Sequence, residues 1–118
     1  MDVAAEDLRR LSRAAFNQAY RLEVMLHIAD SEGFVTQTEV AQALGLSVSN
    51  VQAPIRSLIE CGLLVPMPKT DNRSRFLART DSPAWDWARQ LRDEADRSAQ
   101  QRWVNGLTAA EPGSPRAD

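Results

Sequence analysis

The sequence predicts a mainly α-helical domain with one small β-hairpin, an α+β arrangement, and three observations lead to this prediction. Long stretches without Gly or Pro carry apolar residues at three- and four-residue spacing, as amphipathic helices do. Two short apolar runs flank a polar, charged segment, which is the pattern of a hairpin. The chain has 118 residues, 43% hydrophobic and 25% charged, which are the size and composition of one ordinary folded domain.

The N-terminal part of the chain is predicted to be helical. No Gly or Pro occurs between residues 7 and 30, and the apolar residues recur at helical spacing. The register slips around residues 12–16, which favours two helices in tandem. The first is a short amphipathic arm over residues 1–15, and the second runs from about residue 16 to residue 29. Gly33 then ends the helical pattern.

Two helices separated by a tight turn follow a short apolar strand at residues 34–36. Either Thr36 or Thr38 can cap the first of these helices, and Gly45 ends it. Ser47 can cap the second helix, along which an apolar stripe recurs at helical spacing. A short helix, a tight turn and a longer helix make the helix-turn-helix arrangement.

Apolar runs at residues 63–65 and 76–78 predict two strands joined by a hairpin. The first strand belongs at a sheet edge, because Pro66 and Pro68 have no N–H to give a neighbouring strand. A hairpin added to a helix-turn-helix makes a winged helix. The sequence therefore predicts a winged helix-turn-helix over residues 16–80, with a three-helix core plus a wing.

The C-terminal part predicts one further helix and a tail. Pro83 suits the first helical turn, so we expect a long helix over residues 81–105. Residues 106–118 contain Gly and Pro without an apolar pattern and predict a flexible tail. We expect the long N- and C-terminal helices to serve dimerisation.

The second helix of a helix-turn-helix lies in the major groove of DNA, with its N-terminal residues at the base edges. Asn and Gln side chains pair with adenine, and Arg pairs with guanine. The predicted base-reading residues are Ser47, Ser49, Asn50, Gln52, Ala53 and Arg56, and the predicted phosphate contacts at the preceding helix N-terminus are Thr36 and Thr38. For any one of these side chains, the alternative is an ordinary solvated helix face.

Pro54 lies inside the predicted reading helix, where it has no N–H to donate to the carbonyl of Asn50. Two interpretations stay open at this point. Either the helix is kinked and still presents its first turn to the bases, or the regular helix begins near Gln52 and Asn50 lies in the turn.

Positive charge is concentrated in the predicted wing. Lys69, Arg73, Arg75 and Arg79 against Asp71 give this segment a net charge of +3, whereas the whole chain has −2. A cationic loop beside a reading helix is placed to contact phosphates, or to insert an arginine into the minor groove. We predict wing contacts from Lys69, Arg73, Ser74 and Arg75, with a merely solvated turn as the alternative.

Four short segments, residues 20–25 (YRLEVM), 44–47 (LGLS), 49–51 (SNV) and 61–64 (CGLL), resemble landmarks of the ArsR class of winged-helix repressors. Residues 71–74 (DNRS), with Thr80, are similar to the wing of the MarR class. The resemblance covers residues 16–80. It implies a dimeric transcription regulator in which Ser49, Asn50 and Gln52 read bases and Asp71 orients Arg73 in the minor groove. The clustered Cys or His ligands of metal-sensing ArsR members are not found in this sequence.

All three tryptophans lie in the predicted C-terminal helix, whose other residues are mostly charged. They either cap the core or anchor a dimer interface, where Trp is over-represented, and they could also line a small-molecule pocket between subunits. We favour a homodimer. The predicted interface residues are Leu8, Leu11, Trp85, Trp87, Leu91 and Trp103.

The chain has one cysteine, Cys61, and one histidine, His27, which cannot supply a disulfide or a four-ligand zinc site within one chain. We therefore expect no metal and no cofactor. Cys61 is interpreted as a small packed residue rather than a redox sensor, because no neighbour in the sequence is cationic. His27 is interpreted as a half-buried structural residue.

The predicted function is a sequence-specific regulator of transcription that binds double-stranded DNA as a homodimer, most simply a repressor on a palindromic operator. The alternative is a winged-helix protein-interaction module, whose acidic remainder docks a protein partner. We expect no enzyme, since no Gly-rich phosphate loop, nucleophile motif or metal triplet occurs. The acidic N-terminal residues and the lack of a long apolar run predict a cytoplasmic location, with no membrane partner.

Overall fold

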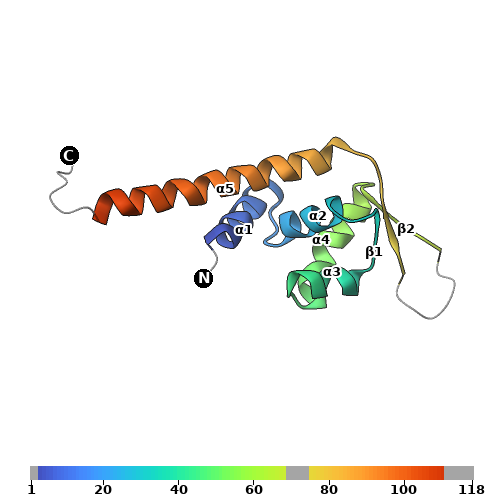
Figure 1. Ribbon diagram of the computed structural model, residues 1–118. Coiled ribbons are helices and arrows are strands. Elements are labelled where there is room, and N and C mark those ends of the chain that lie inside the picture. The colour runs from blue at the N-terminus through green and yellow to red at the C-terminus, as the bar shows by residue number, and fades with distance from the viewer. Residues whose placement is uncertain (1–2, 69–74, 111–118) are drawn as a thin grey trace.

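The computed structural model describes residues 3–68 and 75–110. Its elements are α1 (Val3–Phe16), α2 (Arg21–Ala29), β1 (Phe34–Val35), α3 (Gln37–Leu44), α4 (Val48–Glu60), β2 (Leu64–Pro66), β3 (Leu77–Arg79) and α5 (Pro83–Ala110). The molecule is elongated, 68 × 27 × 23 Å, because α5 runs across the other helices and projects beyond α1 (Figure 1). The predicted fold class, mainly α with a small sheet and a wing, is confirmed.

The corner between α1 and α2 is fixed by one residue in a left-handed conformation and one buried hydroxyl. Asn17 has φ +60°, a region that Asn tolerates better than most residues. The Ser12 hydroxyl is fully buried, donates to the carbonyl of Gln18 and accepts the N–H of Leu22 at 3.0 Å. The two tandem helices predicted from the register slip are confirmed, but the second begins at Arg21 rather than near residue 16, because the corner at Asn17 separates it from α1.

Both helices of the helix-turn-helix begin at side-chain caps. Thr36 Oγ1 accepts the N–H of Glu39 at 3.1 Å, and the Glu39 carboxylate accepts the N–H of Thr36 at 3.4 Å, so Thr36 rather than Thr38 caps α3. Gly45 ends α3 with φ +67°. Ser47 then accepts the N–H of Asn50 at 3.3 Å, so α4 begins directly after it.

Pro54 lies within α4 without ending it. The interpretation that the regular helix begins near Gln52 is therefore wrong. The reason lies at Asn50, whose carbonyl loses its usual donor but belongs to an exposed residue of the first turn, where solvent can bond it. The Pro54 ring itself is buried on the core side.

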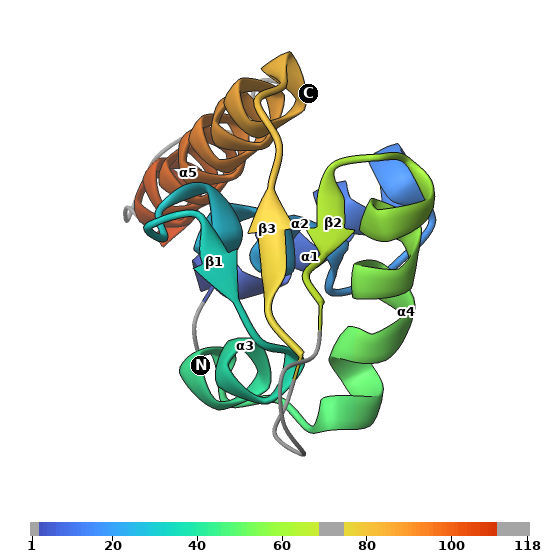
Figure 2. The same cartoon turned by 90° about the vertical axis from the view of Figure 1, so that its right-hand side faces the viewer.

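The wing belongs to a three-stranded antiparallel sheet of order β1-β3-β2, seen face-on in Figure 2. Pro66 pairs with Leu77 on β3, and β2 lies at an edge of the sheet, as predicted from the proline. Both hairpin strands lie one residue later in the chain than the apolar runs predicted.

The core is built around α2, which contacts α1, α3, α4 and α5. Its side chains Leu22, Met25 and Ile28 are at most 1% exposed, and they cluster with Leu58 of α4 and Leu64 of β2. Within the described residues, none of the helices has both the length and the apolar character that a membrane span requires.

Helix α5 begins at Pro83, where the Ser82 hydroxyl accepts the N–H of Ala84 at 3.0 Å. It passes Gly106 and continues to Ala110, so the predicted tail is wrong for residues 106–110. A glycine within a helix costs only about 1 kcal/mol, and the next four residues, Leu-Thr-Ala-Ala, tolerate helix. Residues 111–118 lie outside the described part of the chain.

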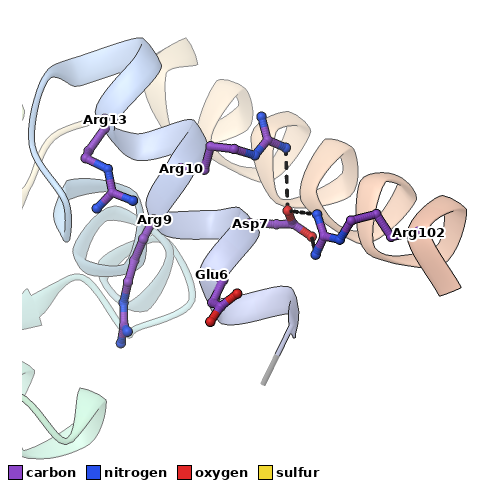
Figure 3. Close-up of a pocket in the computed structure, with 6 residues that line it drawn as sticks. All are labelled: Glu6, Asp7, Arg9, Arg10, Arg13 and Arg102. Atoms are coloured by element: carbon purple, nitrogen blue, oxygen red, sulfur yellow. Dashed lines mark hydrogen bonds and ion pairs between the residues drawn. The ribbon is translucent and has the colours of Figure 1, made fainter. Parts of the chain in front are cut away.

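An ion pair joins α1 to the far half of α5 (Figure 3). Asp7 is only 2% exposed, and Arg102 donates to both of its carboxylate oxygens, to Oδ2 at 2.6 Å. Arg10 adds a second ion pair at 3.5 Å. The hydrogen bonds from Arg102 lower the pKa of the Asp7 carboxyl below its ordinary value.

Candidate nucleic-acid interface

Helix α4 presents one polar face to solvent and one apolar face to the core. Val51, Ile55 and Leu58 are at most 3% exposed. All six predicted base-reading residues are exposed, namely Ser47, Ser49, Asn50, Gln52, Ala53 and Arg56. The amphipathic pattern thus places every one of them on the solvent side, as predicted.

The first turn of α4 leaves donors and acceptors available. The hydroxyls of Ser47 and Ser49 hydrogen-bond to each other at 3.0 Å. The side-chain amides of Asn50 and Gln52 make no hydrogen bond to any described residue, and the Arg56 guanidinium makes no ion pair there. These three side chains are consequently free to bond an external partner.

The structure brings the start of α3 close to the wing. A hollow of about 430 Å³ lies between α3, α4 and the sheet, and Thr38 and Arg75 both line it. Both side chains are exposed. Thr36, by contrast, is only half-exposed, and its hydroxyl already caps α3. It is therefore less available for a phosphate contact than the sequence predicts.

Arg79, which we counted among the wing cations, does not project from the wing, and this part of the prediction is wrong. Its Nη1 donates to the carbonyls of Ile28 at 2.7 Å, Ala29 at 3.0 Å and Ser31 at 3.1 Å. The carbonyls at a helix C-terminus lack partners within the helix and carry partial negative charge, which attracts a guanidinium. Arg75 is exposed, whereas Lys69, Asp71, Arg73 and Ser74 lie outside the described residues.

The residues predicted for a dimer interface divide into two groups. Trp85 is 5% exposed, and its indole N–H donates to the carbonyl of Thr80 at 2.7 Å, so it belongs to the core of this chain instead. Leu8, Leu11 and Leu91 are partly buried against the same core. Trp87 is 44% exposed and packs edge-on against Phe16, and Trp103 is 63% exposed.

Cys61 is not the packed residue that the sequence suggested. It is exposed at the C-terminal cap of α4, and the Arg21 Nη2 lies 3.7 Å from its sulfur. This cation comes from 40 positions earlier in the chain, where no local pattern reveals it. His27 is half-buried as expected, with Nε2 3.1 Å from a carboxylate oxygen of Glu39.

Gln18 is a contact of α4 that the sequence analysis missed. Its side-chain amide donates to the Ser57 hydroxyl at 3.0 Å and so ties the α1–α2 corner to α4. No signal in the sequence links two residues 39 positions apart. In the described part of the chain, no group of three or more His, Cys, Asp and Glu residues is arranged to hold a metal ion.

The structure combines two capped helices, a tight turn between them and an antiparallel hairpin. These are the features of a winged helix-turn-helix, and known proteins share them. Residues 20–74 match the MarR family. The apo form of wild-type MarR from E. coli has a TM-score of 0.65 at 17% identity, over 90% of this chain and 78% of that chain. A MarR-family regulator from Silicibacter pomeroyi has 0.60 at 17%, over 94% and 71%.

A MarR-family regulator from Rhodococcus sp. RHA1 has a TM-score of 0.55 at 24% identity, over 88% of this chain and 72% of that chain. No curated protein matches the sequence. The predicted resemblance to the MarR class is confirmed by the match over residues 20–74, and these structures confirm the winged-helix fold. The ArsR part of the resemblance stays a prediction.

Proposed function

We propose that this chain is a sequence-specific transcription regulator, a repressor, that binds double-stranded DNA as a homodimer in the cytoplasm. The observation that carries the proposal is the polar face of α4, on which all six candidate side chains are exposed and the amides of Asn50 and Gln52 have no partner among the described residues. Since the second helix of a helix-turn-helix generally lies in the major groove of DNA, we expect α4 to lie there and the wing to lie at the minor groove.

The chemistry of the exposed side chains suits base reading. The amides of Asn50 and Gln52 can each donate to and accept from adenine, and Arg56 can donate twice to guanine, with about 1–3 kcal/mol of discrimination for each good pair. Thr38 and Arg75, on either side of one hollow, suit successive phosphates. Since the whole chain is acidic, DNA affinity rests on this local surface.

The homodimer is proposed from α1 and α5. The far half of α5 extends beyond the winged helix (Figure 1), held to α1 by the Asp7–Arg102 ion pair, and it presents the exposed Trp103. Exposed tryptophan is enriched at the centres of protein interfaces. A symmetric dimer would read two half-sites about 10 base pairs apart.

The proposal is tested by titrating the protein into the duplex that lies directly upstream of its own coding region, with a scrambled duplex of equal length as the control. We expect a preference above about tenfold for the upstream duplex at moderate salt, within the range of specific recognition. Absence of duplex binding at low salt would instead favour the protein-interaction module. Light scattering of Trp103→Ala tests the dimer, and we expect its mass to fall to that of one chain at concentrations where the unaltered protein is dimeric.

A further inference from the structure

The outer face of the three-stranded sheet is open and apolar. In Figure 2 the helices lie behind or beside the sheet, and none of them covers the face turned to the viewer. Successive side chains of a strand point to opposite faces, so the neighbours of the buried Val35, Leu64 and Leu77 point outward. The outward side chains on the paired strands and their extensions are Phe34, Val65, Met67, Phe76 and Ala78.

This composition is unusual for a sheet face in water, because antiparallel sheets ordinarily carry polar side chains on their solvated side. Phe34 is 57% exposed, Val65 46% and Phe76 54%. Phe34 and Val65 lie on either side of Ala78 in one cross-strand row, and Phe76 lies two residues before Ala78 on its strand. The result is one contiguous apolar patch without a charged side chain among its described residues, and such patches mark contact surfaces.

The edges of the sheet offer little to an added strand. At one edge, Pro66 within β2 and Pro68 after it have no N–H to donate. At the other edge, β1 has only two residues. Short edge strands and edge prolines both hinder pairing with a foreign strand. A partner of this sheet must therefore pack on its face, side chain against side chain.

The face is suited to a second copy of itself. The rings of Phe34 and Phe76 flank the small Ala78, so raised positions adjoin a low one. A two-fold axis brings the same patch of both copies together, and a ring of one copy can then lie over Ala78 of the other. The contact is also free of charge repulsion, although each chain carries a net charge of −2.

The area of the face indicates a weak contact. Each half-exposed phenylalanine leaves about 100 Å² in water, so the whole patch is on the order of 300 Å². A stable protein interface buries about 800 Å² on each partner. The contact therefore adds to a dimer that another surface already holds. Figures 1 and 2 show that the sheet face lies at the opposite end of the molecule from the projecting half of α5.

We propose that this sheet face binds the same face of a second copy, with Phe34 of each copy over Ala78 of the other. A dimer joined through α5 carries the face at both outer ends, so the contact joins neighbouring dimers end to end. The contact itself does not depend on DNA. Its use in placing two dimers side by side on one duplex, where their effective concentration is high, rests on the proposed function.

Sedimentation equilibrium without DNA tests the contact between about 0.02 and 1 mM protein, in a Trp103→Ala background that removes the proposed α5 contact. We expect the average mass to double over this range, with a Kd on the order of 0.1–1 mM. Amide NMR spectra over the same range locate the contact, and the shifts that change should lie in β1, β2 and β3. A constant mass, or shifts confined to the helices, would overturn the proposal and leave the face to a different protein.

A matched pair of substitutions separates this face from exposed apolar residues in general. Val65→Thr alters the face, and Val48→Thr makes the same change at the start of α4, where the valine is 41% exposed. We expect Val65→Thr to raise the Kd about threefold, Phe34→Thr to raise it at least tenfold, and Val48→Thr to leave it unchanged. Circular dichroism checks that all three variants fold. Equal Kd values for Val65→Thr and Val48→Thr would refute the assignment of the contact to the sheet.

Binding to the upstream duplex is measured in parallel. Self-association through the sheet without duplex binding would refute the DNA-binding function alone. Duplex binding without self-association would refute the sheet contact alone.

Discussion

Substituting Arg79 by alanine is expected to destabilise the fold without weakening the contacts to DNA phosphates. The guanidinium of Arg79 joins β3 to the C-terminus of α2 through three carbonyls, at 2.7 to 3.1 Å. It therefore positions the wing on the helical core rather than reaching outward. Arg75, four residues earlier in the chain, is exposed and serves as the matched control for loss of an arginine.

The free-energy cost of Arg79→Ala depends on which hydrogen bonds the three carbonyls keep when the guanidinium is removed. Hydrogen bonds to charged groups contribute about 1.5–3 kcal/mol each. The Ala29 carbonyl still accepts from Arg89 at 3.0 Å, however, and the Ile28 carbonyl still accepts from the Ser31 hydroxyl at 2.6 Å. The loss is therefore well below three full bonds, and we expect about 2 kcal/mol. For a domain of this size, that lowers Tm by about 8 °C.

Thermal unfolding followed by circular dichroism measures the effect for Arg79→Ala, Arg79→Lys and Arg75→Ala. The lysine variant keeps the charge but not the fork, so its Tm should lie between those of the alanine variant and the unaltered protein. Arg75→Ala should change stability by less than about 0.5 kcal/mol, yet lower the salt dependence of duplex binding by about one unit. An Arg79→Ala protein with unchanged Tm, or with the reduced salt dependence, would refute the assignment.

Three further substitutions test the packing beneath the interface. Asp7→Asn removes the partner of Arg102. Because the pKa of Asp7 is lowered in the folded protein, the stability that this carboxylate adds is complete above its ordinary pKa of about 3.9 and is lost as the pH falls through the folded pKa. Thermal unfolding at acid pH should therefore show a flatter pH dependence of Tm in the variant than in the unaltered protein. Ser47→Ala removes the α4 cap and should cost about 1 kcal/mol in urea unfolding, with Ser49→Ala costing clearly less. Leu58→Ala empties a fully buried site and should cost about 2–5 kcal/mol; a cost under 1 kcal/mol would contradict the core described above.

The parts of the fold that the sequence predicts correctly are those decided by neighbours in the chain. Thr36 and Ser47 each cap a helix through an N–H three residues later, so the cap and its target lie within one window. The amphipathic stripe of α4 likewise decides which side chains face outward. For this reason the sequence predicts, residue by residue, which of the candidate base-reading side chains are exposed.

The errors arise where distant segments meet or where competing preferences are small. Arg79 finds its carbonyls 48 to 51 positions away, and Cys61 finds Arg21 at 40 positions, so composition alone suggested a wing cation and an uncharged environment. The sequence predicts that the helix ends before Gly106, but a cost of about 1 kcal/mol is too small to stop a helix that is already long.

The most direct test of the central claim is to measure the affinity of Gln52→Ala for the upstream and scrambled duplexes, beside Gln90→Ala on the exposed side of α5. If the outer face of α4 reads bases, Gln52→Ala loses about 1–3 kcal/mol of affinity for the upstream duplex and almost none for the scrambled one, while Gln90→Ala binds both normally. Equal losses on both duplexes, or no loss on either, would contradict base reading by this helix.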